Sequence, residues 1–286
     1  MPSGWRLTLV VDREVPLTAY AGVFAYTLAL KILRDYDQLA SERLHEQELP
    51  FKPLALSPLM SAKGNVPRVL KPEVKYSLEL YIFHPEYEMI FHKAITERIA
   101  EIIHLPACNV AIVEAELMLR QWDDLRKEAS ELVESIMADR KFRLNFITPC
   151  QLGRLTRSRK RKPLFRLFPD PPSIIRSLAR HWNAFSEIKL DADKIIEWSE
   201  EELFERAYRL RTKAIPLGEG RTTVGFIGWC EYEFRNIEKD IAQDLATLLK
   251  YAEIAGVGKH RTLGMGRVRT LNELRLHLNS QRSLNR

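Results

Sequence analysis

The chain has 286 residues, of which 45% are hydrophobic and 29% charged, the composition of a soluble globular protein that can bury a core. A net charge of +6 suits a polyanionic partner. The longest apolar run, residues 19–30, is too short to span a bilayer, and the start has no signal-peptide hydrophobic region. These features argue against a membrane or secreted protein, and we predict a cytoplasmic one.

The N-terminal half alternates between strand-like and helix-like patterns. The predicted elements are strand 5–11, helices 17–33 and 35–45, strands 54–60 and 74–83, a helix, and strand 110–119. The helix before the last strand carries an apolar stripe at helical spacing: Phe91, Ile95, Ile99, Ile102 and Ile103. The order βαββαβ predicts a ferredoxin-like unit, which is also the fold of the common RNA-recognition module.

The C-terminal half repeats this order. The predicted elements are a connecting helix 122–137, strand 141–149, helix 173–185, strands 208–215 and 222–234, helix 237–254 and a last strand after Gly264. We therefore predict an α+β protein with tandem ferredoxin-like domains. The predicted boundaries are residues 1–122 for the first domain, 123–138 for the connector and 139–286 for the second domain.

A glycine-rich stretch near the C-terminus, residues 255–269, links a predicted helix to a predicted strand. Two Gly-x-Gly pairs bracket three side chains that can be cationic: Gly256, Gly258, Lys259, His260, Arg261, Gly264 and Gly266. Backbone N–H groups freed in such a loop, together with these side chains, predict a phosphate site. The spacing matches neither the P-loop nor the dinucleotide fingerprint. A plain helix-to-strand turn with a solvated basic face is an equally good interpretation.

A second basic stretch follows the strand 141–149. Its cations alternate with apolar residues such as Leu155 and Phe165, which favours an ordered segment lying along RNA over a solvated loop. The cations that we expect to contact RNA are Arg157, Arg159, Lys160, Arg161 and Lys162.

The three cysteines are far apart, odd in number and without C-x-x-C spacing: Cys108, Cys150 and Cys230. This pattern predicts reduced, mostly buried thiols. The sequence also has no His-x-x-x-His and no carboxylate cluster. We therefore infer no metal site and no cofactor.

Four short motifs, in order along the chain, resemble those of the RAMP superfamily of CRISPR proteins, in particular its crRNA-processing endoribonucleases. They are Leu44-His45-Glu46 with Ser57-Pro58-Leu59, the strand Phe146-Ile147-Thr148-Pro149, the strand beginning Val224-Gly225-Phe226-Ile227-Gly228, and Gly256-x-Gly258 with Gly264-x-Gly266. The resemblance implies an endoribonuclease that cuts CRISPR repeat RNA in precursor transcripts. It also implies metal-independent chemistry, in which the 2′-hydroxyl attacks the adjacent phosphate and leaves a 2′,3′-cyclic phosphate and a 5′-hydroxyl.

The resemblance assigns the catalytic histidine to His45, and Lys52 matches a lysine that some members use to stabilise charge. The family's tyrosine has no exact counterpart, so Lys31, Tyr26 or no residue supplies the third group. The implied partners are repeat RNA and CRISPR effector subunits, with the chain a monomer or a homodimer. A non-catalytic RNA-binding subunit of such a complex, or a general two-domain RNA-binding protein, are the alternatives.

Overall fold

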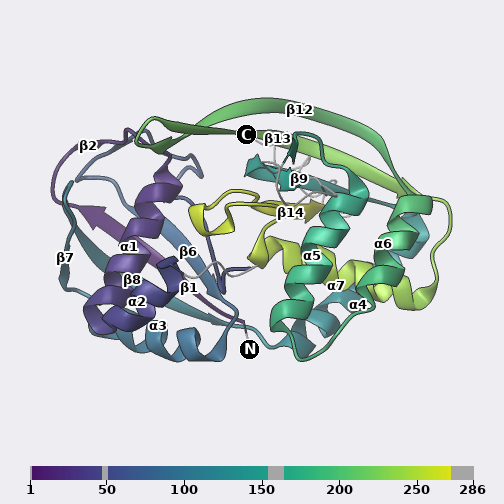
Figure 1. Ribbon diagram of the computed structural model, residues 1–286, viewed down its shortest axis with the longest axis horizontal. Coiled ribbons are helices and arrows are strands. Elements are labelled where there is room, and N and C mark those ends of the chain that lie inside the picture. Colours follow the sequence, from purple (N-terminus) through teal and green to yellow (C-terminus); the bar gives the residue numbers. More distant parts are fainter. Residues whose placement is uncertain (1, 47–50, 154–163, 272–286) are drawn as a thin grey trace, which may run out of the picture. The chain divides into compact units, whose positions relative to one another are not determined.

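Two β-sheets with helices packed against them organise the chain (Figure 1). The computed structural model describes residues 2–46, 51–153 and 164–271. The described chain divides into two units that are not continuous in sequence. The first unit joins residues 1–121 to residues 214–223 and 260–265, and the second takes residues 122–213, 224–259 and the chain from Gly266 onward.

The first unit is built on a sheet of strand order β3-β6-β1-β8-β7, with β4 also paired to β6. Its elements are β1 (Ser3–Val11), β2 (Val15–Pro16), α1 (Ala21–Tyr36), α2 (Gln38–Glu46), β3 (Leu54–Leu56), β4 (Met60–Ser61), β5 (Val69–Leu70), β6 (Tyr76–Ile82), α3 (Pro85–Glu97), β7 (Ile102–His104) and β8 (Asn109–Leu119). The four strands β3, β6, β1 and β8 are antiparallel neighbours in the order 2-3-1-4 of a ferredoxin-like fold.

Alternation in β1 decides which face of this sheet is buried. Leu7 and Leu9 are fully buried in the core, whereas Arg6 lies on the opposite face. There Arg6 forms ion pairs with Glu79 at 3.1 Å and with Glu116 at 2.8 Å. The outward face of the first sheet is therefore a ladder of paired charges.

The apolar stripe predicted for the helix before the last strand, α3, is wrong beyond Ile95. Helix α3 ends at Glu97, and Ala100 takes a left-handed φ of 67° that a continuing helix does not allow. Ile102 and Ile103 instead lie in the strand β7, which pairs with β8. A β-branched isoleucine fits this pleated edge better than a helix, which explains the change of element.

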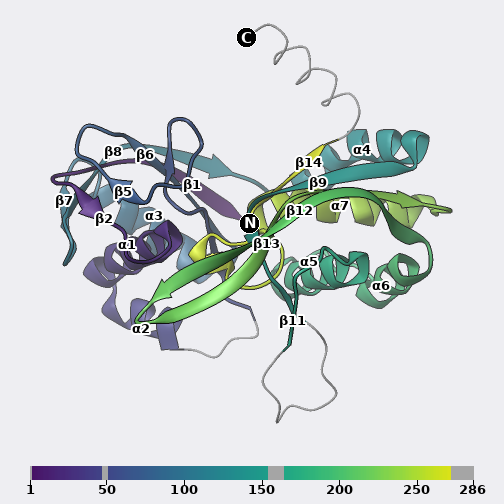
Figure 2. The ribbon, with the colours of Figure 1, turned by 90° about the horizontal axis from the view of Figure 1, so that it is seen from above.

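The second unit repeats the topology. Its elements are α4 (Trp122–Asp139), β9 (Lys141–Cys150), β10 (Leu152–Gly153), β11 (Phe165–Arg166), α5 (Pro171–Phe185), α6 (Ala192–Glu201), β12 (Leu203–Gly218), β13 (Arg221–Phe234), α7 (Lys239–Ala255) and β14 (Val268–Leu271). The sheet order β12-β13-β9-β14 is again 2-3-1-4. The prediction of tandem ferredoxin-like folds is confirmed. Strands β12 and β13 run side by side as a long hairpin in both views (Figures 1 and 2), and its tip, residues 214–223, belongs to the first unit.

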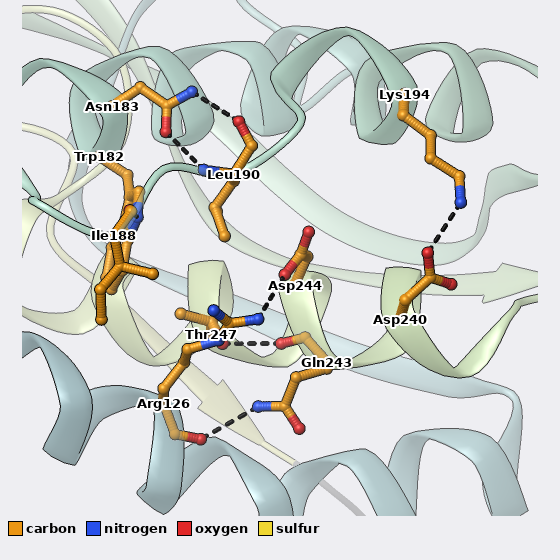
Figure 3. Close-up of polar contacts among 10 residues, drawn as sticks. All are labelled: Arg126, Trp182, Asn183, Ile188, Leu190, Lys194, Asp240, Gln243, Asp244 and Thr247. Carbon is orange, nitrogen blue, oxygen red and sulfur yellow. Dashed lines mark hydrogen bonds and ion pairs between the residues drawn. The ribbon is translucent and has the colours of Figure 1, made fainter.

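Helix α7 is held by polar contacts from helices on two sides (Figure 3). From α4, Arg126 pairs with Asp244 at 3.5 Å, and its carbonyl oxygen accepts a hydrogen bond from Gln243 at 3.0 Å. From α6, Lys194 pairs with Asp240 at 2.8 Å. Helix α6 was not predicted from the sequence, although Asp191 caps its start by accepting from the Lys194 amide.

The segment His260–Met265, which contains the short 3-10 helix η1 (Arg261–Leu263), packs inside the first unit. A Cβ atom on Gly264 would lie 2.3 Å from the amide nitrogen of Pro58, and one on Gly22 of α1 would lie 1.8 Å from the carbonyl oxygen of Leu263. Met265 completes a small buried cluster with Tyr20 and Ile215. The glycines are therefore required where backbone meets backbone.

We expect Gly264→Ala to lower the thermal midpoint more than Gly220→Ala does. Both glycines have a left-handed φ, +69° and +70°, so both variants incur about 1–2 kcal/mol of backbone strain. Only Gly264 also meets Pro58, which adds overpacking of about 1–3 kcal/mol, whereas a Cβ on Gly220 meets nothing within 4 Å. Equal midpoints by calorimetry would show that the contact with Pro58 relaxes without cost.

Candidate functional site

His45 lies in the last turn of α2, with an exposed side chain. The preceding residue, Leu44, is buried in the core and fixes the helix end. The start of α2 is fixed as well, because Asp37 accepts a hydrogen bond from the Ala40 amide at 2.9 Å. The imidazole is thus presented to solvent from a rigid element.

Lys52 approaches the same helix end from the segment before β3. Its Nζ donates to the carbonyl oxygen of Leu44 at 2.7 Å and to that of His45 at 3.4 Å. The last carbonyl groups of a helix lack intrahelical donors and carry the negative end of the helix dipole, so an ammonium group there is favourable. Partial burial lowers the pKa of Lys52. Lys52 therefore fixes the backbone of His45 and places a positive charge at the end of α2.

Tyr26 of α1 brings a third polar group to this place. Its ring centroid lies 6.4 Å from that of His45. Burial raises the pKa of the Tyr26 phenol, so the hydroxyl stays protonated and can donate a hydrogen bond. The other residue considered from the sequence, Lys31, forms an ion pair with Asp35 one turn further along α1. The geometry favours Tyr26 over Lys31 as the third group.

Three residues with an imidazole, an ammonium and a neutral phenol therefore lie near the end of α2. Such a set can transfer a proton, offset negative charge and donate a hydrogen bond to a phosphate oxygen. Of the other histidines in this unit, His84 immediately precedes α3, and His104 contacts the Asn109 side chain at 2.7 Å.

The glycine-rich stretch does not offer its backbone to an anion as predicted. Its amides already donate to protein acceptors at 2.8–3.2 Å: those of Val257, Gly258, Lys259, Gly264, Met265, Gly266 and Arg267. Gly256 ends α7 with a φ of 70°, and its amide donates to Ala252 within the helix. These amides are therefore not free to form the predicted nest, and the side chains of the stretch are the better candidate phosphate ligands.

Those side chains are divided between the two units. Lys259 belongs to the second unit and lies over the ring of Phe165 at 4.7 Å. His260 and Arg261 belong to the first unit, where His260 adopts a left-handed φ of 60° and Arg261 is largely buried. Arg157, Arg159, Lys160, Arg161 and Lys162 lie outside the described residues. Arg166, at the end of that basic stretch, pairs with Asp170.

Strand β12 carries a row of cations that the sequence analysis missed. Arg209, Arg211 and Lys213 are all exposed on this edge strand of the second sheet. Residues two apart in a strand point to the same side, so the three side chains form a continuous basic edge. The sequence could have revealed this row, because three cations at i, i+2 and i+4 fall inside the predicted strand 208–215.

The cysteines are free and buried, as predicted. Among residues 2–46, 51–153 and 164–271, no three His, Cys, Asp or Glu side chains are grouped so that they could hold a metal ion. Within the same ranges no helix has the length and apolar character needed to cross a membrane.

Residues 144–268 match the family model of the CRISPR-associated endoribonuclease Cas6. The CRISPR-associated endoribonuclease Cas6 of Mycobacterium tuberculosis strain CDC 1551 is 27% identical over 130 residues, which is 46% of this chain and 38% of the relative. The protein of strain H37Rv gives the same values. The aligned segment thus spans well under half of the curated relatives' length.

Solved structures share the fold over nearly the whole chain. A Cas6 product complex superposes with a TM-score of 0.75 at 22% identity, covering 95% of this chain and 100% of that one. Thermus thermophilus Cas6 gives a TM-score of 0.65 at 21% identity, with 95% and 98% covered. A RAMP protein described as binding different RNA substrates gives 0.56 at 10% identity, with 94% and 100% covered. The family model over residues 144–268 and the curated relatives show that this chain is similar to Cas6 endoribonucleases, and the solved Cas6 structures show that it shares their fold.

Proposed function

We propose that the chain is a metal-independent endoribonuclease that cleaves CRISPR repeat RNA in precursor transcripts to release crRNAs. The observation that carries the proposal is the exposed His45, flanked by the Tyr26 ring at 6.4 Å and by Lys52 at the helix end. The similarity to Cas6 endoribonucleases suggests the substrate class. The alternative function is that of an RNA-binding subunit that does not cut RNA. It differs from the proposed function only in whether His45 acts on the bound RNA.

The proposed chemistry is an in-line attack by the ribose 2′-hydroxyl on the adjacent phosphorus. The bond to the 5′-oxygen breaks, and a 2′,3′-cyclic phosphate and a 5′-hydroxyl result. One proton must leave the 2′-hydroxyl and one must reach the departing 5′-oxygen. We assign the transfer to His45, because an imidazole can accept one proton and give one up, and so can carry the proton from the 2′-hydroxyl to the 5′-oxygen.

The other two groups act on the charge that develops at phosphorus. Tyr26 donates a hydrogen bond from its neutral hydroxyl to a non-bridging oxygen, and Lys52 lends positive charge while holding the backbone of His45. Both interactions work without a metal ion, because the phosphorane charge is met by protein donors.

Repeat RNA would be held by cations on both units. We assign phosphate contacts to Lys259, His260 and Arg261, and also to the β12 row of Arg209, Arg211 and Lys213. The run from Arg157 to Lys162 would add further contacts. CRISPR effector subunits are further proposed partners. The proposed oligomeric state is a monomer or a homodimer.

We expect His45→Ala to lower the single-turnover cleavage rate by about 10²–10⁴-fold, because loss of a general acid or base has this cost. Affinity for repeat RNA should not change, since an exposed imidazole in the last turn of α2 holds none of the core. The rate is measured with protein in excess over a labelled repeat, and affinity by filter binding.

His84→Ala is the matched control, because His84 is also exposed in the first unit and its side chain makes no capping hydrogen bond. Cleavage at the normal rate by His45→Ala would remove the histidine from the mechanism. Tyr26→Phe keeps the ring and deletes the hydroxyl, so it should cause a smaller rate loss at unchanged affinity.

Replacing Arg209, Arg211 and Lys213 together by glutamine should weaken RNA binding and flatten its salt dependence. Each phosphate contact to single-stranded nucleic acid contributes about −0.7 to the slope of log K against log salt concentration. Loss of three contacts should therefore make the slope shallower by about 2 units. The measurement is a series of binding isotherms between low and moderate salt.

A second triple variant controls for the change in net charge. Arg13, Lys75 and Lys194 each already pair with a carboxylate at 2.8–3.3 Å, so their replacement by glutamine should leave the slope nearly unchanged. Equal slopes for the two triple variants would mean that the β12 row contacts no phosphate.

A further inference from the structure

Exposed aromatic side chains gather on two strands of the second unit. In the part of the chain that the structure describes, four aromatic side chains are prominently exposed, and three of them lie on β11 and β12: Phe165 at 44%, Phe204 at 39% and Tyr208 at 58%. The fourth is Tyr36 of α1 at 38%. Aromatic rings contribute most when buried, so a concentration of exposed rings indicates a surface that a partner covers.

Phe165 is held in place by a cation rather than by the core. In the β10–β11 pair it stands opposite Gly153, and Lys259 Nζ lies 4.7 Å from its ring centroid. A Cβ on Gly153 would lie 3.4 Å from Lys259 Cε, at van der Waals contact, so the lysine side chain packs directly over this position of β10. The cation–π contact orients Phe165 while almost half of the side chain stays exposed.

The ring of Tyr208 is held by a second aromatic ring, that of Phe168. It meets Phe168 edge-to-face, with centroids 5.2 Å apart and planes at 87°. The segment that carries Phe168 is tied to the sheet, because the Tyr232 hydroxyl donates to the Pro169 carbonyl oxygen at 2.8 Å. A ring fixed in this way loses little conformational freedom when something stacks on it.

The chemistry around these rings selects the ligand. Lys259 lies over the ring of Phe165, whereas Arg209 and Arg211 are exposed on the opposite face of β12 from Tyr208. The nearby carboxylate of Asp170 is occupied by Arg166. Two fixed, exposed rings, one with a cation beside it, match a nucleic-acid strand that offers planar bases and phosphates, and only unpaired bases have a free face.

We propose that Phe165 and Tyr208, supported by Lys259 and Phe168, form an aromatic platform on which unpaired bases of RNA stack. This inference rests on the proposed RNA-processing function and adds that the substrate presents single-stranded nucleotides to the second unit. The contact requires no particular base, because every base has a π face.

The test is the affinity for an oligouridylate of about ten nucleotides, a length within the usual site size of single-strand binders. Phe165→Leu and Tyr208→Leu should each weaken binding by about 5- to 150-fold, the usual effect of losing one stacked base. Phe165→Trp and Tyr208→Phe keep a ring and should retain affinity. Phe204→Leu removes an exposed ring from the same strand outside the platform and should also bind normally.

An oligomer with the same phosphates but abasic ribose units separates stacking from charge. The Leu variants should bind it as well as the unaltered protein does, because no base remains to be stacked. Undiminished oligouridylate binding by both Leu variants would overturn the proposal. So would an equal loss in Phe204→Leu, or an equal loss on the abasic oligomer.

These readouts are independent of catalysis, because they measure binding and can be repeated in the His45→Ala background. A chain that never cuts RNA can still show the platform, and an active nuclease can lack it. Unchanged thermal midpoints confirm that each variant is folded. If one Leu variant fails to fold, the other still decides the outcome.

Discussion

The close approach of the backbone at Gly264 to Pro58, and of Leu263 to Gly22, is the constraint on which the first unit depends. No residue with a Cβ fits either contact without displacing backbone. Through these contacts, residues 260–265 from near the C-terminus become part of the unit that carries His45 and Lys52. The first unit therefore cannot complete its packing until almost the whole chain has been made, and contacts this distant in sequence slow folding.

The same packing changes the role of the glycine-rich stretch. Because most of its amides donate to protein acceptors, this stretch has a structural role. Those hydrogen bonds fix the backbone and so determine where its positive side chains can contact a ligand. Lys259, for example, passes over Gly153 and reaches the ring of Phe165, which pairs with that glycine. The catalytic proposal depends on a similar arrangement, in which Lys52 binds the carbonyl groups at the end of α2 and so fixes the residue that we propose to act.

Much of this architecture follows from sequence patterns. Alternation in β1 and β6, alanine and leucine in α1, and the repeated βαββαβ order predict both ferredoxin-like folds, because these patterns are local. The end of α3 was misjudged because isoleucines at helical spacing continue past Glu97, while a left-handed Ala100 stops the helix. Helix α6 was missed because it is short and strongly charged.

The site was predicted less completely, since it depends on contacts between distant elements. His45 and Lys52 were identified from local context and family resemblance. The choice between Tyr26 and Lys31 needed the structure, because residues five apart on a helix point in different directions and only one can face α2. The acceptors of the loop amides, and the contacts that hold the rings of Phe165 and Tyr208, come from other segments of the chain. No local sequence pattern predicts them.

The most direct test of the central claim is incubation of the purified protein with a repeat-containing transcript in the presence of EDTA. We predict one discrete cut in each repeat, with a 2′,3′-cyclic phosphate on the upstream fragment and a 5′-hydroxyl on the downstream one. A 2′-deoxy nucleotide at the cut position should block cleavage and leave binding intact. Tight binding without any cut, a strict requirement for Mg²⁺, or a 3′-hydroxyl end on the upstream fragment would contradict the account.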